Sequence, residues 1–195
     1  VLIGGSSPMM VSHAQLKELH AQLDTGALNG FHIQALLRHE NPFDLDNVVI
    51  NWGHVYQTLG MENEFRADIG RIATTADPKF WDVCVIKGVT PNKVVKALRG
   101  LGVDMSLYTD DLDTNVPTND REPAKSSYSV RFQKTIEADP ELKDKSANTL
   151  AEEKIQGITL LERLLLELGY FLTTGKHLDI ENVTLCSGSR HSDGL

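Results

Sequence analysis

The stretch "FWDVCVIKGVTPNKVVKALRGLGVDMSLYT", residues 80–109, decides the fold. Its first part, residues 80–88, is a dense run of β-branched and aromatic residues, which indicates a buried strand. Thr90 then supplies an N-cap and Pro91 a first helical residue that needs no N–H partner, and a glycine at 100 or 102 ends the helix. Residues 103–109 again have the pattern of a strand. Strand, short helix and strand predict a βαβ unit, whose strands would run parallel with a right-handed crossover.

Further along the chain, "SYSVRFQ" alternates like a strand with one buried face. The run "GITLLERLLLELGYFLTTG" is apolar on all but a narrow stripe, which predicts a buried core helix over Ile158–Thr173 that covers one face of the sheet. The run "NVTLCSGSR" indicates one more strand. Residues 78–195 are therefore predicted to form an α/β (or α+β) domain with a mixed sheet of about four strands around the βαβ unit.

The N-terminal part has a different pattern. Residues 1–11 are expected to be a disordered or cloning-derived tail, and residues 12–60 a helical region. Three short helices are expected there, beginning at Ser12, Asn29 and Asn47. Gln15 completes a capping box with the first N-cap. A strand over residues 47–52 is the alternative to the third helix.

Composition excludes several classes of protein. The 195 residues are 41% hydrophobic and 24% charged, with a formal net charge of −8. We therefore expect a soluble globular protein that binds neither nucleic acid nor an anionic membrane, because no run of Lys and Arg offers a basic patch. The longest apolar run contains three charged residues, too many for a bilayer-spanning helix. Cys84 and Cys186 have no metal-type spacing, and two free thiols in a reducing cytoplasm are favoured over a disulfide.

Three stretches are long and specific: "KGVTPNKVVKALRGLGVDMSLYTDDLD", "GITLLERLLLELGYFLTTGKHLDIENVTLCSGSR" and the closing "SDG". In them the chain resembles, from Phe80 onward, a family of bacterial hypothetical proteins with no assigned activity. The resemblance implies no ligand or partner, so it assigns no site residue. Similar sequences continue past "SDG" into a Trp- and Tyr-rich segment, which implies that the strand expected at Asn182–Cys186 exposes an edge.

An acidic loop follows the central stretch. Its oxygen-bearing side chains occupy positions one, three, five, nine and twelve of a calcium-loop frame: Asp111, Asp113, Asn115, Asn119 and Glu122. Val116 stands where such a loop needs glycine, and a strand rather than a helix leads into it. We favour a solvated, self-capped loop, with a metal site on Asp111, Asp113, Asn115 and Glu122 as the alternative.

The loop "KGVTPNK", residues 87–93, joins the first strand to its helix. Ligands gather at the carboxyl ends of strands in open α/β sheets, and helix N-termini attract anions. The cofactor-binding candidates are Lys87, Gly88, Thr90 and Lys93. The loop lacks the second glycine and the Lys-Ser/Thr ending of a P-loop, so plain helix capping is favoured.

Two other groups are not favoured as sites. Cys186, His191 and Asp193 have the residue types of a thiol nucleophile, a base and its orienter, but an ordinary strand end and turn is the favoured explanation. The histidines are spaced in pairs seven residues apart, His13 with His20 and His32 with His39. Two helical turns separate the members of each pair by about 10 Å, too far to chelate one ion alone.

No catalytic residue is assigned. The sequence favours a non-catalytic interaction or structural protein, with a protein partner or a second copy docking on the N-terminal helices or an open sheet edge. The alternative is a small-ligand or nucleotide-handling enzyme that uses the junction at 87–93 and a divalent ion on the loop at 110–122.

Overall fold

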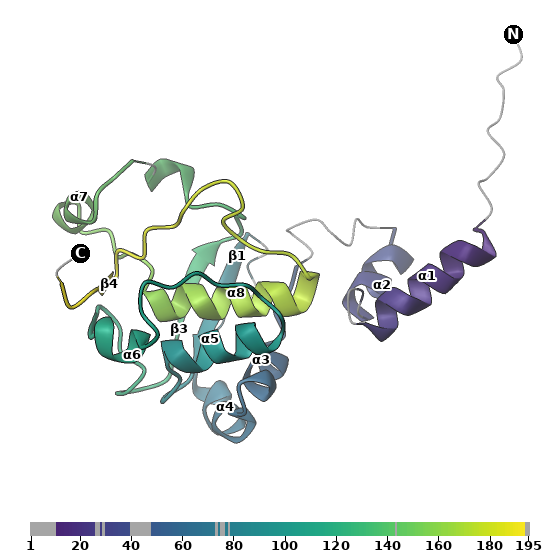
Figure 1. Ribbon diagram of the computed structural model, residues 1–195, viewed down its shortest axis with the longest axis horizontal. Coiled ribbons are helices and arrows are strands. Elements are labelled where there is room, and N and C mark those ends of the chain that lie inside the picture. Colours follow the sequence, from purple (N-terminus) through teal and green to yellow (C-terminus); the bar gives the residue numbers. More distant parts are fainter. Residues whose placement is uncertain are drawn as a thin grey trace, which may run out of the picture. The chain divides into compact units, whose positions relative to one another are not determined.

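The chain divides into two compact units, Val1–Phe43 and Asp44–Leu195. The computed structural model (Figure 1) describes residues 11–25, 28, 30–39, 48–72, 74, 77, 79–142 and 144–193. The division falls earlier than the break suggested by the sequence between residues 60 and 78. The third helix therefore belongs to the second unit.

The first unit contains α1 (His13–Asp24) and α2 (Gly30–Leu37). As predicted, α1 begins with a capping box: Ser12 Oγ accepts from the Gln15 N–H at 3.2 Å, and Gln15 Oε1 accepts from the Ser12 N–H at 2.8 Å. Although its leucines have a helical spacing, no side chain of α1 is buried.

The second unit is built on the antiparallel pair β1 (Phe80–Val85) and β3 (Tyr128–Gln133), in which Phe80 lies opposite Gln133 and Val85 opposite Tyr128. A mixed α/β class is confirmed, but the four-stranded sheet around a parallel βαβ unit is wrong. Among the described residues the strands form two antiparallel pairs, β1–β3 and β2–β4. Residues 103–108 form no strand. Their alternating pattern arises because Val103, Met105 and Leu107 lie half-buried against the core as the chain crosses it.

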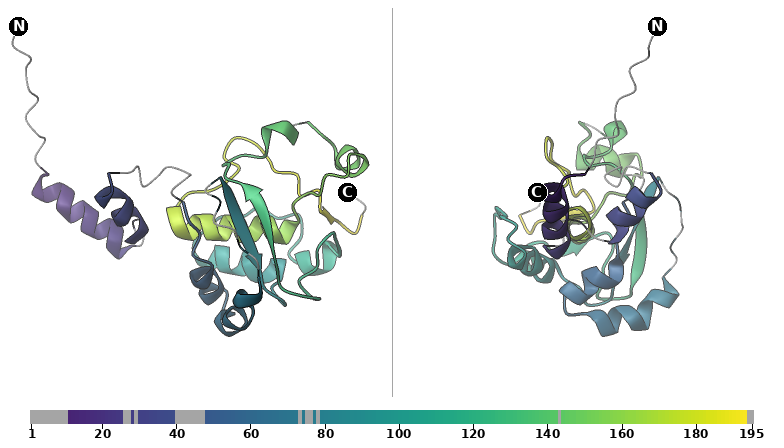
Figure 2. Two further views of the ribbon diagram at one scale, coloured as in Figure 1. Left: turned by 180° about the vertical axis from the view of Figure 1, so that it is seen from behind. Right: turned by 90° about the vertical axis from the view of Figure 1, so that its right-hand side faces the viewer.

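Two helices cover one face of β1 and β3. α5 (Pro91–Gly100) begins at N-cap Thr90 as predicted, and α8 (Leu160–Thr174) closely matches the expected core helix. α8 packs against both α5 and β1, and Figure 2 (left) shows the two strands on one side of it. It ends at Gly175, whose φ of 67° suits glycine because a Cβ is disfavoured there.

The outer edge of β1 is capped by side chains of α3 (Trp52–Thr58). Trp52 Nε1 donates to the Asp82 carbonyl at 2.8 Å. Tyr56 Oη donates to the Cys84 carbonyl at 2.8 Å and accepts from the Ile86 N–H at 2.8 Å. These two carbonyls and one N–H are therefore not available to another strand. α3 begins at Trp52 and residues 48–51 are neither helix nor strand, so both predictions for them were wrong. Val48 and Ile50 are instead buried in the core from an irregular segment. Asn47 lies outside the described residues.

The remaining elements are short. α4 (Glu62–Asp68) and the 3₁₀ helix η2 (Ile69–Arg71) follow α3, and α6 (Leu112–Asn115) lies in the acidic loop. The 3₁₀ helix η3 (Pro140–Leu142) and α7 (Ala147–Glu152) precede α8. β2 (Thr118–Asn119) pairs with β4 (Ser189–Arg190). The strand predicted at residues 182–186 does not form, because its N–H groups meet no partner strand. In the described part of the chain, no helix is long and apolar enough to cross a bilayer.

Candidate functional site

The strand–helix junction lies where the sequence places it, but four of its backbone N–H groups already have acceptors. Thr90 Oγ1 accepts from the Lys93 N–H at 3.4 Å, and Asp113 Oδ1 accepts from the Asn92 N–H at 2.9 Å. Pro91 has no N–H. The backbone N–H groups of Lys87 and Gly88 donate to Ser127 Oγ and the Pro123 carbonyl, at 2.7 and 3.2 Å. A phosphate at this helix N-terminus would have to displace the carboxylate of Asp113.

The acidic loop is held by its own hydrogen bonds. Asp111 accepts from Thr114 Oγ1 at 2.7 Å, from the Thr114 N–H at 3.1 Å and from Asn92 Nδ2 at 2.8 Å. The Thr114 hydroxyl, followed by Asn92, lowers the pKa of Asp111 below its usual value. Asn115 uses its Nδ2 on Thr109 Oγ1 and the Asp111 carbonyl. The loop thus caps α5 and α6.

The other two predicted metal-loop residues have different partners. Glu122 pairs with Lys125 at 2.8 Å, and Asn119 Oδ1 accepts from Ser189 Oγ at 2.6 Å. The structure therefore brings Asp111 and Asp113 together around Asn92 but gives Glu122 a separate contact. Among the described residues, no group of three or more His, Cys, Asp or Glu is placed to hold a metal ion.

The C-terminal cluster is not arranged for nucleophilic catalysis. Burial raises the pKa of the half-buried Cys186 thiol to about 11, which disfavours a reactive thiolate. His191 Nδ1 lies 3.3 Å from Asp193 Oδ2. Arg190 donates to the carbonyls of Ser187 and Ser189.

The four spaced histidines all fall in the first unit. His13 and His20 are exposed on α1, and His32 is buried in α2. His39 lies just after α2 with a φ of 61°.

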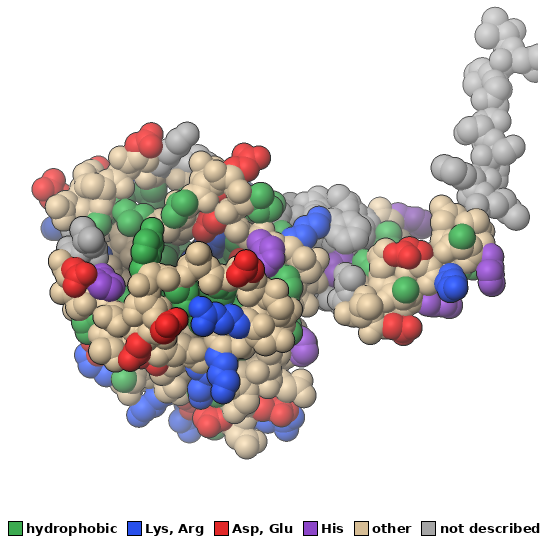
Figure 3. Space-filling model, in the orientation of Figure 1, with side chains coloured by type: hydrophobic (Ala, Val, Ile, Leu, Met, Phe, Trp, Pro, Cys, Tyr) green, Lys and Arg blue, Asp and Glu red, His purple; other side chains and the backbone are tan. Residues whose placement is uncertain are grey.

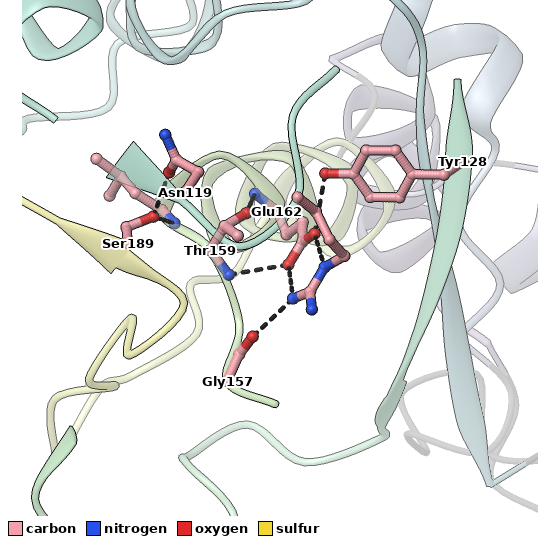
Figure 4. Close-up of polar contacts among 8 residues, drawn as sticks. Asn119, Tyr128, Gly157, Thr159, Glu162 and Ser189 are labelled. Atoms are coloured by element: carbon pink, nitrogen blue, oxygen red, sulfur yellow. Dashed lines mark hydrogen bonds and ion pairs between the residues drawn. The ribbon is translucent and has the colours of Figure 1, made fainter. Parts of the chain in front are cut away.

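A polar cluster that the sequence reading missed lies at the start of α8 (Figure 4). The carboxylate of Glu162 has no exposed surface, and it accepts from Arg121 Nε at 2.6 Å and Nη2 at 2.7 Å. It also accepts from Tyr128 Oη at 3.0 Å and from the Thr159 N–H at 2.8 Å. Arg121 Nη2 reaches the Gly157 carbonyl at 2.6 Å as well.

This cluster has the arrangement of a structural ion pair. Its hydrogen bond to Glu162 raises the pKa of Arg121, and burial, followed by the charge of Glu162, raises that of Tyr128. With both of its oxygens hydrogen-bonded, the carboxylate joins the loop at Arg121, strand β3 and helix α8. The three-residue spacing of Thr159 and Glu162 in the sequence is that of a capping box and could have predicted their contact. No neighbouring residue in the sequence indicates that Arg121 is the ion-pair partner of Glu162.

A second feature is the C-terminal strip, Ile180–Leu185, which runs between α8 and β4 (Figure 1). Three of its side chains are large, apolar and exposed: Ile180 at 67%, Val183 at 89% and Leu185 at 55%. Among the described residues, the N–H groups of Val183, Thr184 and Leu185 donate to no acceptor. Unpaired donors beside exposed apolar side chains are typical of a surface that another chain covers.

The base of the strip is firmly held. Glu137 accepts from the N–H groups of Glu181 and Asn182 at 3.0 and 2.9 Å, and the Glu181 bond is the main reason its pKa is lowered. Asp179 pairs with Arg163 at 2.7 Å and accepts from Thr184 Oγ1 at 2.8 Å. The strip therefore presents its side chains from a fixed position.

Comparisons with known proteins add no homologue. A scan of protein-family models, a search of curated proteins and a search of solved structures each give no match to this chain. Its function is therefore inferred from its own residues.

Proposed function

We propose that this chain is a non-catalytic interaction protein that binds a basic, extended segment of a partner along the C-terminal strip. The observation that supports it is the run of three unbonded N–H groups at residues 183–185, flanked by exposed apolar side chains. A strand added along one edge can satisfy alternate donors, such as those of Val183 and Leu185, with its carbonyls, and pockets or patches for alternate side chains give specificity. Val183 and Leu185 are two residues apart, so in an extended chain both would face one side.

Charge supports a basic partner. The strip and the adjoining segment 136–142 contain four carboxylates and no Lys or Arg: Glu137, Asp139, Glu141 and Glu181. Burial, followed by the charge of Glu141, raises the pKa of Asp139, as expected in a locally negative environment. On the face drawn in Figure 3, acidic and hydrophobic side chains lie together along the upper part of the second unit, whereas most Lys and Arg lie lower. Interleaved Lys or Arg and apolar residues would complement this surface.

We also propose that the chain is cytoplasmic and that it belongs to the bacterial family that its sequence resembles. Two free cysteines support the location, because Cys84 is buried and Cys186 half-buried without forming a disulfide.

The experiment uses the full chain and two synthetic peptides, one alternating Lys with Val and the other Glu with Val. Calorimetric titration should detect binding of the basic peptide, weakened by added salt, and none of the acidic one. Replacing Val183 by Thr and Leu185 by Asn should weaken binding by about tenfold, since apolar contact area is lost. Leu101→Asn, at a residue 40% exposed just beyond α5, is the matched control and should leave the affinity unchanged.

Charge is tested separately. Glu141→Gln with Glu181→Gln should weaken binding of the basic peptide by roughly fivefold, since each surface ion pair contributes about 0.5 kcal/mol. Equal affinity for both peptides, or variants that bind as the parent does, would overturn the proposal. A dimer seen by light scattering that Leu185→Asn dissociates would instead identify a second copy as the occupant, and would also contradict the basic partner.

A further inference from the structure

An aromatic groove lies on the side of β1 away from its pairing with β3. Its volume is about 650 Å³, and its walls come from residues 48–53, from the α4–η2 region and from β1. Phe80, Asp82 and Cys84 of β1 line it, in alternation with the core residues Val83 and Val85. Volumes of roughly 300–1,000 Å³ are typical of small-molecule sites.

The rings in the walls make the groove suited to a flat apolar ligand. Four aromatic residues line it: Trp52, Phe65, Phe80 and Trp81. Both indole N–H groups are committed to the protein, Trp52 to the Asp82 carbonyl at 2.8 Å and Trp81 to the Val48 carbonyl at 3.2 Å. Trp81 is buried, whereas Trp52, Phe65 and Phe80 are half-buried and keep part of each ring accessible. Such ring surfaces prefer stacked or edge-to-face contact with another ring.

The charged groups of the groove are balanced within the protein. Asp82 pairs with Arg131 at 3.2 Å, and the guanidinium of Arg131 lies 5.5 Å from the centre of the Phe80 ring. Asp77 Oδ1 accepts from the Lys79 N–H at 3.0 Å, and Lys134 also has a partner. Asp82 is thus offset by a cation, and Asp77 accepts from a backbone donor. An anionic ligand would have to lose water without gaining an unpaired cation.

We propose that this groove binds an uncharged small molecule with a flat aromatic ring system. The site is separate from the C-terminal strip, so binding there does not depend on the peptide proposal. The chain contains two tryptophans, and both line the groove. Its intrinsic fluorescence therefore reports on this one place.

The probe is N-phenyl-1-naphthylamine, and its control is 8-anilino-1-naphthalenesulfonate, which has the same rings and a sulfonate. Excited at the indole band, the full chain should transfer energy to the uncharged probe with one binding site. The sulfonate should bind at least about tenfold more weakly, because its charge has no partner in the groove. Unlabelled naphthalene should displace the probe, and saturated decalin should not.

A matched pair of variants tests the location. Val49 lines the groove and is 53% exposed, so Val49→Arg places a long cation in it while the guanidinium can still reach water. This variant should lose probe binding by about tenfold or more. Val11→Arg makes the same change at a valine that is 67% exposed and lies outside the groove, and it should bind as the parent does, with both melting temperatures unchanged. Equal affinity for the sulfonate, displacement by decalin, or an unaffected Val49→Arg would overturn the proposal.

Discussion

Arg121 and Glu162, forty-one positions apart, form a two-point ion pair, with Nε and Nη2 donating to Oε1 and Oε2 at 2.6 and 2.7 Å. The Glu162 side chain has no exposed surface and that of Arg121 is 20% exposed. This pair fixes the loop around residue 121 to the first turn of the core helix. The sheet pair β2–β4 lies next to it, tied to α8 because Ser189 Oγ accepts from the Leu160 N–H at 2.8 Å.

Arg121→Met should destabilise the second unit by about 3 kcal/mol, because it leaves the buried Glu162 carboxylate without a cation. The free energy of unfolding in urea measures this loss. Adding Glu162→Gln should recover part of it, since a neutral amide needs no cation, its oxygen can still accept from the Thr159 N–H, and its NH2 group can donate to Tyr128 Oη. Lys125→Met breaks an exposed pair with Glu122 and should cost less than about 0.5 kcal/mol. Equal losses for Arg121→Met and Lys125→Met would contradict a structural role for the buried pair.

Local signals in the sequence predicted the helices better than the sheet. Ser12, Thr90 and Gly175 act at helix ends as their types suggest, because a cap depends on residues only two to four positions away. The core helix was readable from its apolar surface alone, and the strand at Tyr128–Gln133 from its alternation.

Strand pairing was not readable in the same way. β1 pairs with β3 and not with residues 103–108, although both candidates alternate. An alternation of apolar and polar residues indicates only that one side of a segment is buried. A loop that crosses the core has one buried side too, so it shows the same alternation as a strand. Arg121 illustrates the same limit for the polar cluster, since its partner is set by the tertiary fold. The acidic loop matched the spacing of a calcium loop because Asp and Asn are common both as metal ligands and as helix caps. In the structure Asp111 and Asp113 act as caps, since they accept from the N–H groups of Thr114 and Asn92.

Tyr56→Phe should destabilise the second unit by about 1–3 kcal/mol, because the Cys84 carbonyl and the Ile86 N–H both lose their partner in a buried place. Hydrogen exchange at the Ile86 amide should accelerate, which a change confined to packing would not cause. Tyr108→Phe removes the hydroxyl of a fully exposed tyrosine and is the matched control, with no expected change in stability. Unaltered exchange at Ile86 in the Tyr56 variant would show that the hydroxyl does not cap this edge.

Stability should fall as the pH rises from 8.5 to 10, because both thiols are harder to ionise in the folded chain. Burial, followed by the charge of Asp82, raises the pKa of Cys84 from 9.0 to about 12, and burial raises that of Cys186 to about 11. Above pH 9 the unfolded thiols lose protons that the folded ones keep, so the free energy of unfolding decreases by about 1 kcal/mol per thiol across this window.

Urea unfolding under reducing conditions measures that slope, and cysteine variants assign it. Cys84→Ala will lower stability at every pH because it leaves a small cavity, but the slope is the diagnostic quantity. Each single Cys→Ala variant should remove about a third of the pH dependence between 8.5 and 10, and the double variant about two thirds of it. Burial also raises the pKa of Tyr56, Tyr128 and Tyr170 from 10.0, so these three side chains begin to lose protons in the unfolded chain near pH 10 and contribute the rest of the pH dependence. An unchanged slope in the double variant would mean that groups other than the thiols lose protons on unfolding, and that Cys84 and Cys186 ionise alike in both states.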